Sequence, residues 1–149
     1  MMDDVQGFQI KTHDGDRIRF RYFTDQAPET VIAFHHELPF SLAFYHARVS
    51  GEEIWTETGP ILQCPQENAS VFCQPGEVVI GPYEPRRVRT AGMMGIYYGE
   101  GKGLDAANIF ATVWEEDREL LVLLGHQIWR QGEQLLTFEE IPGRITNNE

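Results

Sequence analysis

Side chains that could bind or transform a small molecule are concentrated in one stretch near the middle of this sequence. Residues 44–57 read Phe-Tyr-His-Ala-Arg-Val-Ser-Gly-Glu-Glu-Ile-Trp-Thr-Glu. Two extended runs flank the turn-forming pair Ser50-Gly51, and this pattern predicts a β-hairpin. The loop could contain two residues (50–51) or four (49–52), and both lengths give the same pairing register.

In that register four chemically active side chains share the outer side of the hairpin. Arg48 faces Glu53, and His46 faces Trp55. A cation, a carboxylate, an imidazole and an indole on one surface are more than a hairpin needs to fold, and they indicate a binding site. An ordinary cross-strand salt bridge beside a half-exposed aromatic residue explains the same residues equally well, since such exposed pairs contribute under about 1 kcal/mol.

Composition limits the kind of protein that carries this hairpin. The chain has 149 residues, of which 42% are apolar and 11% aromatic, so we expect a single globular domain over residues 1–149. A net charge of −11 argues against nucleic acid and acidic membranes as partners, because phosphate would be repelled. No apolar run approaches the roughly 18 residues of a membrane span, and no signal peptide is visible, so we expect a cytoplasmic protein.

The cysteines and histidines do not form a metal-binding pattern. Cys64 and Cys73 are nine positions apart, without the spacing of a metal site, and we interpret them as free thiols. We therefore expect no metal ion and no cofactor.

The elements that must position the hairpin are mostly strands. The run from Arg17 to Tyr22 alternates arginine with apolar residues, which predicts a strand with a charged outer face. One helix is expected early, capped by Asp25 and ended by Pro39, and a second over residues 117–132. Other strands are expected over residues 5–11, 77–80, 93–98, 108–114 and 135–141, with loops over 58–76 and 99–103.

These elements predict a mainly β protein in which the strands close into a barrel and the two helices cover it. The last strand is expected at an edge, and its apolar side chains suggest a homo-oligomer. The period of two predicts which residues face the interior: Ile18, Phe20, Tyr22, Ala47, Ile54, Val78, Ile80 and Ile109.

Three fragments of the sequence resemble the cyclophilin fold. The segment from Ala27 to Phe34 is similar to the opening of the first cyclophilin helix. Tyr45-His46-Ala47-Arg48-Val49 resembles the strand that bears the catalytic arginine, with one residue inserted, and Asn108-Ile109-Phe110 resembles the strand that floors the proline pocket. Residues 46–52, 75–77 and 129–132 look like features of a divergent bacterial branch of cyclophilin-like proteins of uncharacterised function.

The resemblance implies a cyclophilin-like closed β-barrel with one early helix and one C-terminal helix. It implies that Arg48 stands for the catalytic arginine, Asn108 for a substrate-positioning glutamine and Phe110 for the pocket phenylalanine. Trp55 falls where cyclophilins keep a second glutamine, and an indole can stack on a guanidinium but cannot accept a hydrogen bond from it.

Three functions are consistent with these residues. The first is binding of a small organic acid or short peptide in an outer-face groove, with the ligand-binding residues His46, Arg48, Glu53, Trp55, Asn108 and Phe110. The second is peptidyl-prolyl isomerisation through Arg48, which the resemblance alone suggests. The third is an acid–base reaction such as hydrolysis, through His46 with Glu53 or Glu57. The sequence does not identify a ligand or catalytic residues, and it leaves open whether the protein is an enzyme.

Overall fold

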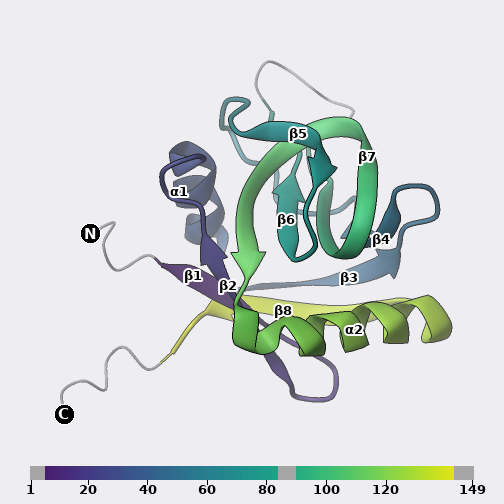
Figure 1. Ribbon diagram of the computed structural model, residues 1–149. Helices are drawn as coiled ribbons and strands as arrows, with labels where there is room; N and C mark the ends of the chain where they lie inside the picture. The colour runs from purple at the N-terminus through teal and green to yellow at the C-terminus, as the bar shows by residue number, and fades with distance from the viewer. Residues whose placement is uncertain (1–5, 84–89, 143–149) are drawn as a thin grey trace, which may run out of the picture.

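The structure, a computed structural model, describes residues 6–83 and 90–142 of the chain. Figure 1 shows strands wrapped into a ring, with one helix beside it and a longer helix along one side. The strands are β1 (Gly7–Lys11), β2 (Arg17–Tyr22), β3 (Phe40–His46), β4 (Gly51–Thr56), β5 (Ala69–Cys73), β6 (Glu77–Ile80), β7 (Met94–Val113) and β8 (Gln134–Glu140). The helices are α1 (Pro28–Glu37) and α2 (Arg118–Gln131), the latter preceded by a 3-10 turn, η2 (Glu115–Asp117).

The strands form a mainly antiparallel ring that closes through β7. Neighbouring strands follow the order β2-β1-β8-β3-β4-β7-β5, and β2 also pairs with β7. The 20-residue strand β7 curves so strongly that β6 pairs with both of its halves, as Figure 1 shows. The predicted barrel with one early and one late helix is therefore confirmed.

The alternation in β2 has the predicted effect on its two faces. Ile18, Phe20 and Tyr22 are buried, and they belong to the main hydrophobic core. The arginines between them lie on the outside, where the Arg19 Nε lies 2.7 Å from the Asp117 carboxylate. A shift of one residue would have placed these guanidinium groups in the core, which explains why this strand was predictable.

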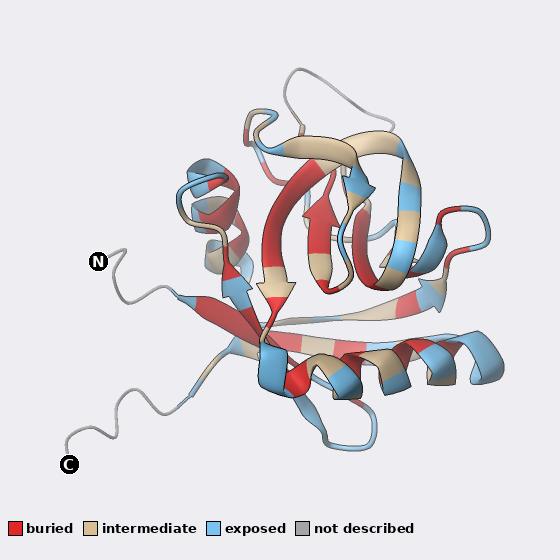
Figure 2. Ribbon diagram, viewed as in Figure 1, coloured by how far each residue is buried: buried red, intermediate tan, exposed pale blue. Residues whose placement is uncertain are grey.

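The core is built on aromatic side chains of the barrel strands and of α1, and it also includes apolar residues of α2. Figure 2 shows the buried stretches of these elements in red. Phe8, Phe34, Phe110 and Phe138 are fully buried and pack with ring centroids 4.8–6.4 Å apart. Each such side chain contributes roughly 1.5–3 kcal/mol by leaving water. In the described residues neither helix has the length and the apolar content required to cross a bilayer.

Several predicted elements differ from the observed ones. Residues 93–98 and 108–114 were expected as two strands joined by a flexible glycine-rich loop, but Met94–Val113 is one strand. A glycine at position 101 lets other parts of the chain approach this strand closely, because a Cβ there would overlap the backbone oxygen of Ser50 and the ring of Tyr97. Residues 69–73, expected in a loop, pair with β7 as strand β5.

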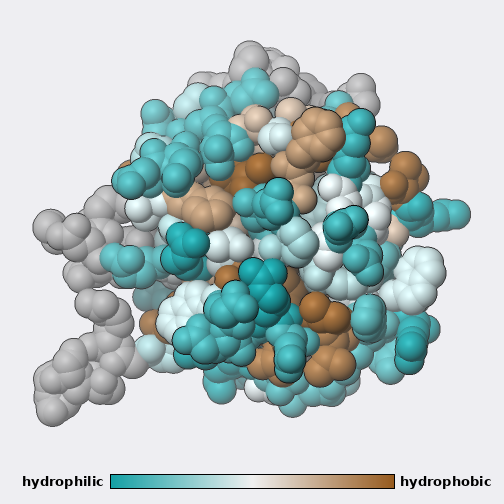
Figure 3. All heavy atoms as spheres, viewed as in Figure 1, coloured by the Kyte–Doolittle hydropathy of each residue, from teal (hydrophilic) through white to brown (hydrophobic). Residues whose placement is uncertain are grey.

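The ends and edges also differ from the prediction. The helix α1 begins at Pro28, and Asp25 does not cap it. Strand β8 pairs with both β1 and β3, so it is an inner strand and the edge argument for a homo-oligomer is wrong. Leu123 and Trp129 of α2 are exposed, and Figure 3 shows apolar side chains gathered over this helix. The sequence also contains a basic segment, Arg86–Arg89, which its acidic surroundings lead us to interpret as structural charge pairing, but this segment lies outside the described residues.

Candidate functional site

A pocket of about 410 Å³ opens on the outer side of the barrel, beside the turn between β3 and β4. Pockets that bind small molecules in proteins usually measure about 300–1,000 Å³, so its size is suitable for a metabolite-sized ligand. Most of its wall is apolar. It is lined by Ala47, Arg48, Val49, Ser50, Glu53, Trp55, Val79, Gly81, Thr90, Met93, Met94, Gly95, Tyr97, Gly103, Leu104, Asp105 and Ala107.

The hairpin that forms one side of this pocket has a different register from the predicted one. Tyr45 pairs with Trp55 and His46 pairs with Ile54, a shift of one position. The amide of Ala47 donates to the backbone oxygen of Glu53 at 2.9 Å, which leaves a five-residue loop between them. The prediction assumed an even number of loop residues, and an odd number moves the partner of every residue by one.

Contacts with β7 explain why the loop takes this length. The amide of Lys102 donates to the backbone oxygen of Ser50 at 2.8 Å, and Gly51 pairs with Gly101. Gly51 has φ of +109°, a value that favours glycine. The turn is therefore fixed by a third strand that is distant in sequence, and local turn rules could not reveal this.

Glu53 is the most unusual group in the pocket because its carboxyl is buried among apolar residues. Its exposure is 8%, and its carboxyl accepts hydrogen bonds from the hydroxyl groups of Ser50 and Tyr97. Burial raises the pKa of Glu53, and these two hydrogen bonds offset part of that effect. A Cβ at Gly95 would overlap the carboxyl, so the neighbouring strand leaves space for it.

Tyr97 connects Glu53 to the half-buried thiol of Cys73. The Tyr97 hydroxyl also makes a hydrogen bond with Cys73, a residue of β5. Burial raises the pKa of Cys73 to about 12, and it raises the pKa of Tyr97 further still. Both groups therefore stay neutral at physiological pH and add no negative charge beside Glu53.

Arg48 lies at the exposed mouth of the pocket. The prediction that it pairs with Glu53 is wrong: within the described residues no ion pair involves Arg48, although both residues line the same cavity. The half-buried Trp55 forms part of the wall, and no contact of the Arg48 guanidinium with its ring is found among the described residues. Val49 and Leu104 are 73% and 75% exposed, which makes the rim apolar.

His46 does not lie on the pocket face. The shifted register turns it to the other side of the hairpin, where its ring packs on Trp129 of α2 with centroids 4.7 Å apart. In the neutral ring Nδ1 donates to the Ala47 oxygen and Nε2 accepts from the Tyr98 hydroxyl, each at 2.7 Å. The expected group of His46 and Trp55 on one face is therefore not formed.

Asn108 and Phe110 are also separated from the pocket. Asn108 is fully buried, and its amide nitrogen donates to Thr30 Oγ1 and to the Pro65 oxygen, each at 2.9 Å. Its amide oxygen accepts from the Glu67 amide at 3.1 Å. Phe110 belongs to the aromatic core. Of the six predicted ligand-binding residues, the structure brings Arg48, Glu53 and Trp55 together and places the other three elsewhere.

Some pocket residues were missed by the sequence analysis. Ser50 and Tyr97 hold the carboxyl of Glu53, and Gly95 makes room for it. A glycine inside an apolar strand indicates a close approach of another group, and Gly95 carried this signal. In the described residues no set of three histidine, cysteine or acidic side chains could hold a metal ion.

Comparison with solved structures places this fold among cyclophilin-like proteins. McbB, solved in complex with tryptophan, matches with a TM-score of 0.72 and 14% identity over 93% of this chain. The chain spans only 46% of the length of McbB. The hypothetical protein AF2241 from Archaeoglobus fulgidus matches with a TM-score of 0.62 and 14% identity, over 91% of this chain and 95% of that one.

A cyclophilin also has a similar fold. A cyclophilin-type peptidyl-prolyl cis-trans isomerase from Cryptosporidium parvum, solved in the presence of the dipeptide Ala-Pro, matches with a TM-score of 0.57 and 13% identity, over 93% of this chain and all of that one. At these identities the likeness concerns the fold. No curated protein matches the sequence. The chain belongs to the protein family of unknown function DUF3830, whose model matches residues 12–139.

Proposed function

We propose that this protein binds a small organic acid or a short peptide in the pocket beside the β3–β4 turn. The observation that carries the proposal is the position of Arg48, an exposed cation at the mouth of a cavity of about 410 Å³ whose wall is mainly apolar. Arg48 belongs to no ion pair within residues 6–83 and 90–142, so its guanidinium can bind a ligand without first losing another partner.

The chemistry of the lining suits such a ligand. A guanidinium offers two parallel N–H donors that match the two oxygens of a carboxylate. Trp55, Met93 and Val79 supply apolar surface for the body of the molecule. Pockets with an apolar wall and few polar groups usually orient their ligand through those polar groups.

The molecules bound to or present with two structural neighbours are of the size that we propose for the ligand. McbB was solved with an amino acid and the Cryptosporidium parvum isomerase in the presence of a dipeptide. Since the identities are 13–14%, this likeness supports a small ligand in general and does not identify one.

The geometry gives less support to the two enzymatic alternatives. Asn108 and Phe110, which would position a prolyl peptide, are fully buried away from Arg48. His46, which would act with Glu53 in acid–base chemistry, lies on the opposite face of the hairpin. We therefore do not propose either activity.

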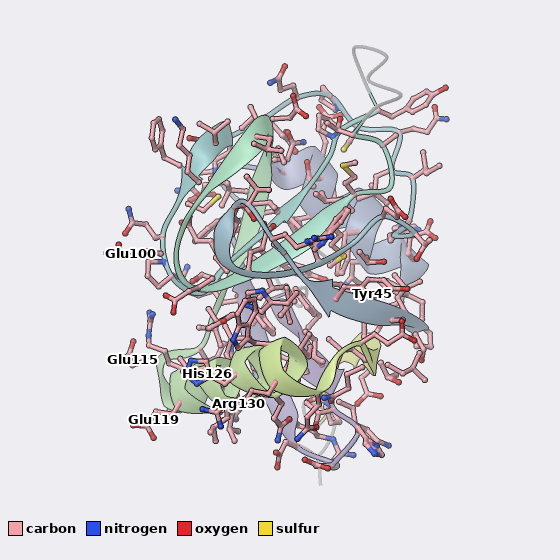
Figure 4. All side chains as sticks on the ribbon, turned by 90° about the vertical axis from the view of Figure 1, so that its right-hand side faces the viewer. Tyr45, Glu100, Glu115, Glu119, His126 and Arg130 are labelled. Atoms are coloured by element: carbon pink, nitrogen blue, oxygen red, sulfur yellow. The ribbon has the colours of Figure 1, made fainter. Side chains whose placement is uncertain are left out.

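The proposal can be tested by measuring thermal shifts with a panel of organic acids, amino acids and dipeptides, followed by calorimetry on any compound that stabilises the protein. We expect Arg48→Ala to weaken binding of carboxylate ligands by about tenfold or more, the loss expected for a charge-assisted contact. Arg130→Ala is a matched control, because Arg130 is an exposed arginine of α2 that does not line the pocket (Figure 4). Absence of binding by the whole panel, or equal affinities for the wild type and Arg48→Ala, would refute the proposal.

A further inference from the structure

We propose that Glu53 binds a positively charged nitrogen of the ligand, so that the pocket is selective for small zwitterions of the amino-acid type. This inference rests on the proposed function of the pocket and adds a second recognition point to it. Arg48 would bind the carboxylate at the mouth, and Glu53 the ammonium group on the inner wall.

The first support is the burial of an acid without a cationic partner. Glu53 lines the pocket with 8% exposure, and within the described part of the chain it belongs to no ion pair. Its hydrogen-bond donors are the neutral hydroxyl groups of Ser50 and Tyr97. A carboxylate in such surroundings is costly unless a cation compensates it, and the open side of the pocket is where a ligand could supply one.

The second support is that the surrounding chain accommodates this carboxyl specifically. Gly95 of β7 lies against it, and any larger residue there would displace it. Ser50 comes from the loop and Tyr97 from β7, so two separate elements orient the group. A glutamate that only filled space could be replaced by an apolar residue, and it would not require a glycine and two hydroxyl donors.

Burial also raises the pKa of Glu53 itself, so its carboxyl stays protonated to a higher pH than an exposed glutamate does. Tyr97 on β7 and Cys73 on β5 have raised pKa values and stay neutral. The charge of Glu77 in β6 contributes to the raised pKa of Cys73 and is not among the causes that shift the pKa of Glu53. Arg48 and Asp105 are further charged residues of the lining.

This arrangement predicts a coupling between ligand binding and proton release. Burial raises the pKa of Glu53, so the free protein keeps this carboxyl protonated to a higher pH than it would an exposed glutamate. A bound ammonium group favours the ionised form, and binding must then release a proton. The affinity for a zwitterion is therefore expected to fall as the pH is lowered through the pKa of Glu53 in the free protein.

The experiment uses sets of probes that differ by one charged group. Tryptophan, indole-3-propionate and tryptamine form one set, and phenylalanine, 3-phenylpropionate and phenethylamine form another. Binding is measured by calorimetry from pH 5 to pH 8, in buffers of different ionisation enthalpy, for the wild type, Glu53→Gln and Glu57→Gln. Glu57 is an exposed glutamate just after β4 and serves as the control.

We expect the amino acid of at least one set to bind about tenfold or more tightly than its amine-free analogue, with proton release at low pH. In Glu53→Gln this preference and the proton release should both disappear, while the affinity for the amine-free acid should stay the same or increase. Glu57→Gln should behave as the wild type. These results would support the inference.

Two failures can be distinguished. The inference is wrong, and the proposed function stands, if amine-free acids bind as tightly as the amino acids and their binding depends on Arg48. The same holds if Glu53→Gln keeps the preference for the amine. If no probe and no member of the wider panel binds, the proposed function fails and the inference fails with it.

Discussion

Replacing Asn108 with alanine should destabilise the protein strongly, whereas replacing Arg48 should leave its stability nearly unchanged. Both residues were predicted to bind a ligand at one site. The structure places Asn108 in the interior, where its amide joins α1 and the segment around Pro65 to strand β7. Arg48 is exposed and belongs to no ion pair among the described residues.

The expected magnitude follows from the hydrogen bonds that each substitution removes. The Asn108 amide makes bonds of 2.9, 2.9 and 3.1 Å to Thr30, Pro65 and Glu67. At about 1 kcal/mol for each bond, Asn108→Ala should lower the free energy of unfolding by about 3 kcal/mol. For a chain of this size that corresponds to a fall in melting temperature of roughly 6–12 °C. Arg48→Ala should change the free energy by less than about 0.5 kcal/mol.

Urea unfolding followed by tryptophan fluorescence measures both values. Thr30→Val removes the hydroxyl that accepts from Asn108, so the Thr30 and Asn108 variants and their double mutant should show a coupling free energy of about 1 kcal/mol. If Asn108→Ala costs less than about 1 kcal/mol but weakens ligand binding, Asn108 is a binding residue, as the cyclophilin resemblance implied. A loss of about 3 kcal/mol in Arg48→Ala would show that the pocket mouth is a structural brace.

Four further results are expected. Burial raises the pKa of Glu53, so the stabilisation that comes from its neutral carboxyl is complete below about pH 4.3 and is lost as the pH rises through the pKa of the folded protein. Urea titrations from pH 4 to pH 8 should therefore show the wild type losing stability relative to Glu53→Gln. The hydrogen bonds from Arg19 lower the pKa of Asp117, so Asp117→Asn should lower the free energy of unfolding by about 1.5–3 kcal/mol at pH 7. This difference in stability from the wild type should shrink as the pH falls below about 4. Gly95→Ala should destabilise the protein by about 1–3 kcal/mol through overlap with the Glu53 carboxyl, and calorimetry should show the loss of any preference for amine-bearing ligands. The homo-oligomer stays a prediction, now based on the exposed apolar residues of α2 alone, and light scattering that gives the 17.1 kDa monomer would contradict it.

Much of the barrel could be predicted because its strands alternate sharply between the two faces. In β2, three apolar residues point inward and three arginines outward, and no other register keeps the charges in water. In β6, the inward positions of Val78 and Ile80 were predicted correctly, although Val79 on the opposite face is also apolar and buried. The period of two is a reliable signal where one face is strongly charged or strongly apolar.

The signal fails where both faces of a strand are covered. Ile109 was expected in the main core, but it packs with Val79 and Tyr97 in a smaller cluster, while its neighbour Phe110 enters the main core. Both residues are buried, and alternation cannot then show which of them faces inward. The same ambiguity hid Ala47, which is buried in the wall of the pocket rather than in the core.

The geometry of the candidate site depended on whether one loop has an even or an odd number of residues, and the residue types alone could not predict this. An even loop would have placed His46 beside Trp55 and Arg48 opposite Glu53, forming an exposed polar surface. The observed odd loop removes His46 from that face and leaves Glu53 within an apolar wall. Contacts with β7 fix the parity, and they involve residues about 50 positions away in the sequence. These contacts keep Glu53 apart from a protein cation, and in our proposal they leave it free to bind a cation on a ligand.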